Sequence, residues 1–475
     1  MKSNSRRRFI GNIIGGSIGV GALSFCSFPS KDKSSGKSDK EMPVIKEVDI
    51  CVLGGSCTGV FAAVRATRLG ARVAIIEKQN AFGGVATNSM VNVWHSLLNT
   101  EYNKQIIAGL TSEVIERLSR RNSVFKSEKS ASVGVTFNSQ ELKIELDELV
   151  LESKITPYLH TLFSQPYLDE NGKLAGVIVD NKSGRGIIKA KYFIDATGDG
   201  DLCFRLGLES YTNELLQPPT MCAHFDNWNN EQFNSLLKLH WKEFNIPEGF
   251  VWGAKVPLTN SYMLAGTRIY NVNCSVADDL TKAEIEGRRQ IRAIMDMMRK
   301  YGKNQEPGLV GLPSVIGIRE TRHIKCLYQV SDNDGLYGKR FDDAIANGSY
   351  RFDLHRQDKP GITFKYLDGT EVYSRPGYPE EKTRWREALP VNPTFYQIPL
   401  RSLIPPKFDN LMIAGRMLDA SIVAFSGIRV MVNMNQLGEA AGVTSYLALN
   451  QNKPISAINP AEVRDNLAKG GSIII

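Results

Sequence analysis

The densest run of reactive polar side chains in this 475-residue sequence is Arg319-Glu320-Thr321-Arg322-His323. A guanidinium binds a carboxylate through two parallel hydrogen bonds, so Arg319 and Arg322 could hold an acidic substrate. Glu320 or His323 could then move a proton, since carboxylates and imidazoles are the usual acid–base groups of enzymes. The alternative is a network of ion pairs between parts of the fold, and the sequence leaves both interpretations open.

A second candidate group is the glycine-rich segment Gly54-Gly55-Ser56-Cys57-Thr58-Gly59, which directly follows an apolar run over residues 48–53. A helical pattern continues to Leu69, and a second apolar run ends on Glu77. This predicts a βαβ unit whose first turn places a dinucleotide pyrophosphate at a helix N-terminus. Because Ser56 replaces the middle glycine of the motif, the segment alone indicates a dinucleotide without saying which one.

The context of Glu77 strengthens this interpretation. A carboxylate at the end of the second strand can accept hydrogen bonds from a ribose, and its charge disfavours a 2′-phosphate. Gly83-Gly84 then offers a second close backbone approach, near Lys78. The alternative for these residues is a solvated strand end followed by an ordinary turn.

The elements that must position these groups alternate between strand and helix patterns. We expect helices over about 104–120 and 139–152, short strands over 155–161, 174–179 and 186–190, and a strand at 192–195 that leads into Ala196-Thr197-Gly198-Asp199. A capping box at Thr281 and Glu284 predicts a helix that ends at Gly302. A buried strand at 411–414 precedes Gly415-Arg416, and a long helix runs from Ile428 to about Leu449.

These motifs, in this order, resemble the FAD-dependent oxidoreductases of the glutathione-reductase-type fold, and more narrowly the flavoproteins related to the flavin-binding component of heterodisulfide reductase. The resemblance covers about residues 46–450. It is carried by Gly54-Gly55-x-x-x-Gly59, Glu77-Lys78, Gly83-Gly84, 194–202, 217–220, 317–322, 396–401, 413–416, 429–431 and 438–442. The cluster cysteines of heterodisulfide reductase are absent, so we expect neither its iron–sulfur clusters nor its disulfide chemistry.

The resemblance implies FAD as the cofactor. The cofactor-binding residues expected from it are Gly54, Gly55, Ser56, Cys57, Thr58, Gly59, Glu77, Lys78, Gly83, Gly84, Ala196, Thr197, Gly198, Asp199, Gly415, Arg416, Asp419, Ile428 and Arg429. It also implies that Arg429 opens the helix whose N-terminus faces the flavin pyrimidine, where the helix dipole stabilises negative charge on the reduced ring.

Flavin performs hydride transfer at N5, so the protein need only orient a substrate and handle a proton. His95 follows the second glycine loop by about ten residues and could lie over the flavin edge. His224 and His355 are further candidates, although a lone histidine is more often structural. No histidine or cysteine spacing suggests a metal site or a redox-active dithiol.

We therefore predict an α/β fold with a Rossmann-like FAD-binding domain over 46–210 and 401–455, an inserted α+β substrate domain over 211–400, and a tail at 456–475. The predicted function is hydride transfer between flavin N5 and a small organic substrate, such as a carbohydrate or organic acid, with an electron acceptor left open. The alternatives are an NAD-dependent dehydrogenase and a flavin-bearing electron-transfer or binding protein without turnover. Ala196-Thr197-Gly198 and the strand before Gly415 argue against the dehydrogenase, which needs neither.

The N-terminus carries a separate signal. Arg6-Arg7 precede a glycine-rich apolar stretch, so residues 1–30 resemble a twin-arginine export signal. We expect a flexible linker over 31–45. Such a signal implies a periplasmic protein. The alternatives are a membrane anchor or a lipid tether at Cys26.

Most of the formal charge of +8 comes from the first 40 residues, which contain eight basic and two acidic residues. The rest of the chain is close to neutral and shows no basic surface of the kind that binds nucleic acid. A hydrophobic fraction of 42% is that of an ordinary globular protein.

Overall fold

The computed structural model describes residues 42–475 except 128, 131, 304–305, 356–357 and 376–377. The predicted export signal, Cys26 and most of the predicted linker lie outside the described residues. Pro43–Ile475 forms one compact unit. Within the described part of the chain, no helix combines the length and the apolar character that a membrane span requires.

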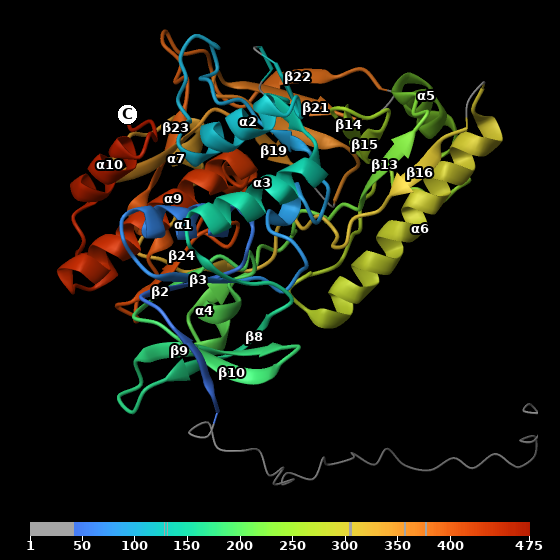
Figure 1. Ribbon diagram of the computed structural model, residues 1–475. Coiled ribbons are helices and arrows are strands. Elements are labelled where there is room, and N and C mark those ends of the chain that lie inside the picture. Colours follow the sequence, from blue (N-terminus) through green and yellow to red (C-terminus); the bar gives the residue numbers. More distant parts are fainter. Residues whose placement is uncertain (1–41, 128, 131, 304–305, 356–357, 376–377) are drawn as a thin grey trace, which may run out of the picture. The chain divides into compact units, whose positions relative to one another are not determined.

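A five-stranded parallel sheet forms the centre of this unit (Figure 1). Its strands, in spatial order, are β24 (Leu411–Ile413), β11 (Tyr192–Asp195), β2 (Ile50–Leu53), β3 (Val73–Ile76) and β7 (Thr156–Tyr158). Four of them are buried along their whole length, which explains why they appear in the sequence as continuous apolar runs. The predicted α/β fold class with a Rossmann-like core is confirmed.

Helix α1 (Cys57–Arg68) lies directly against α9 (Met431–Gln451), as Figure 1 shows. The contact is close because α9 presents glycines: a Cβ at Gly438 would lie 2.0 Å from the carbonyl oxygen of Thr58, and one at Gly442 2.2 Å from that of Ala62. A buried ion pair between Arg65 and Glu439 joins the same two helices. The helix α10 (Pro460–Lys469) packs on α9.

Three predicted helix boundaries change. The helix expected from residue 104 is α2 (Leu110–Arg120), because Gly109 at φ +68° cannot continue a helix. The helix expected from Thr281 is α6 (Ala277–Tyr301), and its predicted end at Gly302 is confirmed. The Thr281 hydroxyl donates to the carbonyl of Ala277 inside the helix, so Thr281 is not the N-cap and no capping box forms there. The helix expected from Ile428 is two helices: α8 (Ile422–Ile428) ends at Arg429, and α9 begins anew at Met431.

The crossover between β7 and β11 is a small meander. It consists of β8 (Leu162–Leu168), β9 (Leu174–Asn181) and β10 (Gly184–Lys189), with β1 (Val44–Glu47) added parallel to β10. The sequence did not predict β8, which contains Pro166; a proline is tolerated there because β8 is an edge strand. Helix α3 (Ser139–Glu152) lies where it was predicted, capped by Asn138.

Residues 211–400 build mostly antiparallel sheets. Buried residues between Met221 and Ile316 form a separate hydrophobic cluster, whereas most of those from Ile324 to Leu400 belong to the main core. One sheet has the order β14 (Trp252–Lys255), β15 (Tyr262–Ala265), β13 (Cys222–Asp226) and β16 (Gly308–Gly311), and α5 (Asn230–His240) and α6 contribute to its hydrophobic cluster. Another contains β19 (Phe352–Leu354), β20 (Ile362–Lys365), β21 (Thr370–Ser374) and β22 (Glu381–Arg384). The boundaries at 210 and 400 stay predictions.

The remaining elements are short. They are β4 (Val93–Trp94), β5 (Val124–Lys126), β6 (Val135–Phe137), α4 (Asp201–Arg205), β12 (Ser210–Tyr211), β17 (His323–Ile324), α7 (Asp332–Leu336), β18 (Ala344–Gly348) and β23 (Tyr396–Pro399).

Candidate functional site

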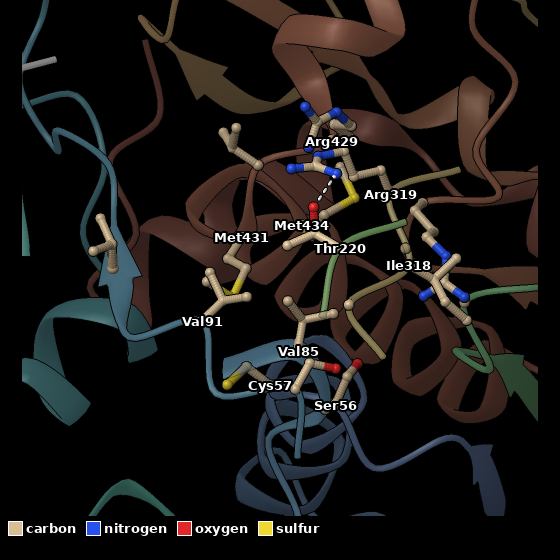
Figure 2. Close-up of a pocket in the computed structure, with 18 of the residues that line it drawn as sticks. Ser56, Cys57, Val85, Val91, Thr220, Ile318, Arg319, Arg429, Met431 and Met434 are labelled. Atoms are coloured by element: carbon tan, nitrogen blue, oxygen red, sulfur yellow. Dashed lines mark hydrogen bonds between the residues drawn. The ribbon is translucent and has the colours of Figure 1, made fainter. Parts of the chain in front are cut away.

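A cavity of about 340 Å³ opens at the carboxyl ends of β2, β3, β11 and β24. Fifteen of the nineteen predicted cofactor-binding residues line it: Gly54, Ser56, Cys57, Thr58, Glu77, Lys78, Gly83, Gly84, Ala196, Thr197, Gly198, Asp199, Gly415, Arg416 and Arg429. In Figure 2, Ser56 and Cys57 lie on one side of this cavity, and Arg319 and Arg429 lie on the other. The strand-end position is where open α/β sheets bind their ligands.

The other four predicted residues lie behind the lining. A Cβ at Gly55 would meet the Phe82 ring at 2.6 Å, and one at Gly59 would meet the Gly54 carbonyl oxygen at 1.9 Å, so both glycines permit close packing of the turn. Ile428 is fully buried. The Asp419 carboxylate accepts hydrogen bonds from the Tyr211 hydroxyl, the Gln329 amide and the Cys326 backbone N–H.

Ser56 fits the turn despite replacing a glycine. Its backbone is extended, at φ −62° and ψ 169°, a conformation that any residue adopts. Its side-chain oxygen caps α1 by accepting from the N–H of Gly59 at 3.5 Å. The strained position is Gly54, at φ +100°, where a Cβ would lie 2.2 Å from the carbonyl oxygen of Ala196. The loop therefore needs glycine at 54 but not at 56.

Glu77 is held in place at the end of β3. Its Oε2 accepts from the N–H of Gly55 at 2.7 Å, and its Oε1 accepts from the N–H of Gln79 at 2.8 Å. The residue is only 8% exposed, yet it lines the cavity. Each carboxylate oxygen keeps a second lone pair, so the group can also accept hydrogen bonds from ribose hydroxyls.

Asp199 and Arg416 form an ion pair at the neighbouring strand ends, with Nη2 2.5 Å from Oδ1. The Thr321 hydroxyl donates to the same oxygen at 2.7 Å. Burial opposes ionisation of Asp199, but the positive charges of Arg416 and Lys78 outweigh it and hold the pKa of this carboxyl below its usual value. Because Asp199 is paired with Arg416, Lys78 and the N-terminus of α1 are the features beside this ion pair that suit a phosphate group.

Two of the five predicted catalytic residues, Arg319 and His95, line the cavity, and three do not. Glu320 accepts from the N–H of Gln217 at 2.9 Å, and His323 Nε2 lies 3.1 Å from its Oε1. Arg322 donates to the carbonyl oxygen of Asp199 and to the Asp201 carboxylate, both at 3.1 Å. The three side chains therefore hydrogen-bond to neighbouring segments of the chain beside the cavity and do not face its interior.

The tautomer of His95 follows from its partner. Nδ1 lies 2.6 Å from the carbonyl oxygen of Ser132, which can only accept, so Nδ1 carries the hydrogen. Nε2 is left with a free lone pair and has no hydrogen-bond partner among the described residues. The ring stacks on Tyr350 with centroids 4.0 Å apart, and burial lowers the pKa of His95 to about 4. His95 is therefore neutral near pH 7 and able to accept a proton.

An ionic cluster that the sequence did not reveal centres on Asp353. Its Oδ1 pairs with Arg429 Nη2 at 2.6 Å, and its Oδ2 accepts from the Tyr350 hydroxyl at 3.1 Å and lies 3.6 Å from His355 Nε2. Burial opposes ionisation of Asp353, but the charge of Arg429 outweighs it and lowers the pKa of the carboxyl. Alternating polar residues at 353 and 355, beside β19, are the one sequence signal that could have indicated this cluster.

Of the other predicted candidates, His355 lines the cavity, whereas His224 lies on β13 outside it. Burial lowers the pKa of His224 to about 4. No group of three or more His, Cys, Asp or Glu side chains within the described ranges is arranged to hold a metal ion.

The residues present fit a bound FAD. A Cβ at Gly54, Gly59 or Gly84 would collide with Ala196, Gly54 or Ser56, so these glycines let the two glycine loops and the end of β11 pack closely around the cavity. The carboxylate of Glu77 suits a ribose, and the N-terminus of α1 with Lys78 suits a pyrophosphate.

Two curated proteins match about a third of the chain. The chain is 29% identical over 161 residues to mitochondrial dihydrolipoyl dehydrogenase of Schizosaccharomyces pombe, covering 32% of this chain and 28% of that protein. It is 26% identical over 166 residues to thiamine thiazole synthase of Pyrococcus horikoshii, covering 32% and 58%. The chain thus spans less than two thirds of the length of either curated relative.

Among solved structures, a geranylgeranyl bacteriochlorophyll reductase-like protein of Thermoplasma acidophilum aligns with a TM-score of 0.43 and 13% identity over 90% of this chain and 84% of that one. The myxobacterial chondrochloren halogenase, an FAD-dependent enzyme, aligns with a TM-score of 0.44 and 11% identity over 90% and 80%.

The sequence profile of the family described as FAD dependent oxidoreductase matches residues 49–467. That span contains both glycine loops, Asp199, the Asp353 cluster and α9. The chain therefore belongs to the family of FAD-dependent oxidoreductases.

Proposed function

We propose that the chain is an exported oxidoreductase that transfers a hydride between N5 of FAD and a small organic substrate bound beside the Asp353 cluster. The observation that carries the proposal is the continuity of the cavity, whose lining runs from the glycine loops to Arg319, Arg429 and His95. FAD supplies the hydride chemistry when bound. The protein's own side chains bind and orient the substrate and move the proton.

His95 is the proton-handling residue of this proposal. In the oxidation of a hydroxyl-bearing carbon, the carbon gives up a hydride and the hydroxyl gives up a proton. The free lone pair on Nε2 accepts that proton, because Nδ1 already donates to Ser132. Stacking on Tyr350 keeps the ring in a fixed orientation. In the reverse reaction the same nitrogen returns the proton.

Glu320, Arg322 and His323 are positioning residues in this proposal. They follow Arg319 in the chain, and their hydrogen bonds run to residues 199–217 and to Leu418 rather than into the cavity. They fix the segment that carries Arg319. The narrower resemblance to the heterodisulfide-reductase-related flavoproteins also belongs to this proposal, supported by the order of shared motifs and limited to the flavin chemistry.

The experiment is anaerobic incubation of the purified, FAD-loaded protein with a panel of sugars and organic acids. We expect at least one compound to bleach the visible flavin absorption, and reoxidation by an added acceptor to restore it. If no compound bleaches the flavin while a chemical reductant does, the protein is an electron-transfer or binding protein and the proposal is wrong.

A further inference from the structure

The side of the cavity opposite the glycine loops is rich in arginine and poor in acid. Arg319, Arg351 and Arg429 line it, and Arg268, which is 2% exposed, lies behind His355. Asp353 is the carboxylate in this part of the lining, because Glu77 and Asp199 are held at the nucleotide loops. The four guanidiniums of Arg268, Arg319, Arg351 and Arg429 face this one acid, which leaves an excess of positive charge.

The partners of these arginines show which of them can bind a ligand. Arg429 is engaged with Asp353 at 2.6 Å. Arg268 donates to the Phe250 carbonyl and to His355 Nδ1. Arg351 donates to the Tyr366 hydroxyl at 3.0 Å, and its guanidinium lies 3.6 Å from the Phe364 ring centroid.

Arg319 shares with Arg351 and Arg429 a single engaged nitrogen among the described residues, but unlike Arg429 it has no carboxylate partner. Nη1 donates to the Pro218 carbonyl oxygen at 2.5 Å and to the Thr220 hydroxyl at 2.8 Å, the contact drawn in Figure 2. These two bonds fix the plane of the guanidinium. Nε and Nη2 make no hydrogen bond to the described residues, and this edge is one on which a carboxylate binds through two parallel bonds.

The surroundings make unpaired charge costly here. Phe250, Trp252, Ile362 and Phe364 line the same part of the cavity and keep its polarity low, which strengthens any charge–charge interaction. Burial, with the charges of Arg429 and Arg268, lowers the pKa of Arg319 to about 9, as expected for a cation without enough counter-charge.

We propose that this site binds a small organic dianion carrying two carboxylates, with one carboxylate on the Nε/Nη2 edge of Arg319 and the second beside Arg429 and Arg351, which line the same cavity. The inference rests on the proposed function, because the dianion would be the substrate of the same cavity. It narrows that function from small organic molecules in general to dicarboxylates, and it makes neutral sugars poor ligands. The two negative charges of such a ligand offset excess positive charge that Asp353 alone leaves unbalanced.

The test measures binding rather than turnover. FAD-loaded protein is titrated by calorimetry with malonate and succinate, and with their neutral counterparts malonamide and succinamide. We expect the dianions to bind and the diamides of the same length to bind at least tenfold more weakly. Inorganic phosphate and sulfate serve as anions without a carboxylate; if they bind more tightly than either dicarboxylate, the site recognises tetrahedral anions and the proposal is wrong.

The variant Arg319→Met should weaken malonate binding by about 10- to 100-fold, since a hydrogen bond to a charged group contributes about 1.5–3 kcal/mol. Arg319→Lys keeps the charge but loses the fork, so its affinity should lie between wild type and Arg319→Met. Arg292→Met, on the exposed outer face of α6, removes the same charge far from the cavity and should bind like wild type. Flavin content and circular dichroism check that each variant is folded.

Equal binding of malonate and malonamide by the wild-type protein would overturn the inference, whatever the variants do. Unchanged malonate affinity in both Arg319 variants would overturn it as well. The two proposals fail separately. Malonate binding without bleaching by any compound would leave the anion site intact and refute the oxidoreductase reaction, whereas bleaching by neutral sugars without dianion binding would refute the anion site alone.

Discussion

Replacing Gly54 by alanine tests whether the first glycine turn holds the cofactor for the reason given above. Gly54 has φ +100°, and a Cβ there would lie 2.2 Å from the carbonyl oxygen of Ala196 and 2.9 Å from the Cα of Thr197. Gly184 is a matched control, since its φ is +111° and a Cβ there meets nothing within 4 Å. Both substitutions force alanine into a left-handed conformation, but only one also collides with backbone.

The magnitudes follow from these two contributions. An alanine at strongly positive φ costs about 1–3 kcal/mol, and this applies to both variants. Overpacking against backbone adds about 1–3 kcal/mol at Gly54 alone, because β2 and β11 must move apart to admit the methyl group. We therefore expect Gly54→Ala to be less stable than Gly184→Ala by about 1–3 kcal/mol, and we expect its displaced turn to release FAD.

Urea unfolding gives the free-energy difference, and visible absorption after desalting gives the FAD content per chain. Gly184→Ala should keep its full flavin content, and Gly54→Ala should lose most of it even under conditions in which it remains folded. Gly54→Val, with a branched side chain, should lose all of it. If Gly54→Ala retains stoichiometric FAD and unfolds at the same urea concentration as Gly184→Ala, the assigned role of the turn is wrong.

Three further results are expected. His95→Gln should lower kcat by about 10²- to 10⁴-fold. Protonation of His95 removes the base as the pH falls through about 4, so wild-type kcat/KM should decline there and the decline should be absent in the variant. The same decline in the variant would exclude His95 as the base. Glu439→Met leaves the buried guanidinium of Arg65 without its counter-charge and should destabilise the fold by about 3–5 kcal/mol. The double variant Arg65→Met, Glu439→Met should lose less stability, because neither charge is then buried alone. A double variant no more stable than Glu439→Met would argue against this ion pair. Replacing Arg6 and Arg7 together by lysine should leave the protein in the cytoplasm of a bacterial host, as cell fractionation would show; normal periplasmic delivery would contradict the twin-arginine interpretation.

The nucleotide half of the site could be predicted from sequence because its determinants are local. A buried parallel strand, a glycine turn and the next strand follow one another within about thirty residues, and Glu77 closes the unit. Even the apparent defect at Ser56 has a local explanation, since an extended backbone accepts serine and its oxygen caps α1. The errors lay at helix ends, where a single residue such as Gly109 decides the boundary.

The segment Arg319–His323 shows where local reading ends. Five adjacent polar residues look alike in sequence, but the chain directs Arg319 into the cavity and turns Glu320 and His323 toward Asn213, Gln217 and Leu418. Nothing in the five letters specifies which side chain faces the ligand. That depends on Pro218 and Thr220, whose oxygens fix the Arg319 guanidinium from about one hundred residues away.

The anion site lies still further from local prediction, because its charge balance is a property of the assembled fold. Arg268, Arg319, Asp353 and Arg429 come from four separate segments spread over more than 160 residues, and the sequence indicated a site role only for Arg319 and Arg429. Arg429 lies between α8 and α9, where it pairs with Asp353, so a contact across 76 residues of chain fixes it there. A family match therefore identifies the cofactor from short motifs, whereas the dianion site that we propose depends on how many cations the fold gathers around one acid.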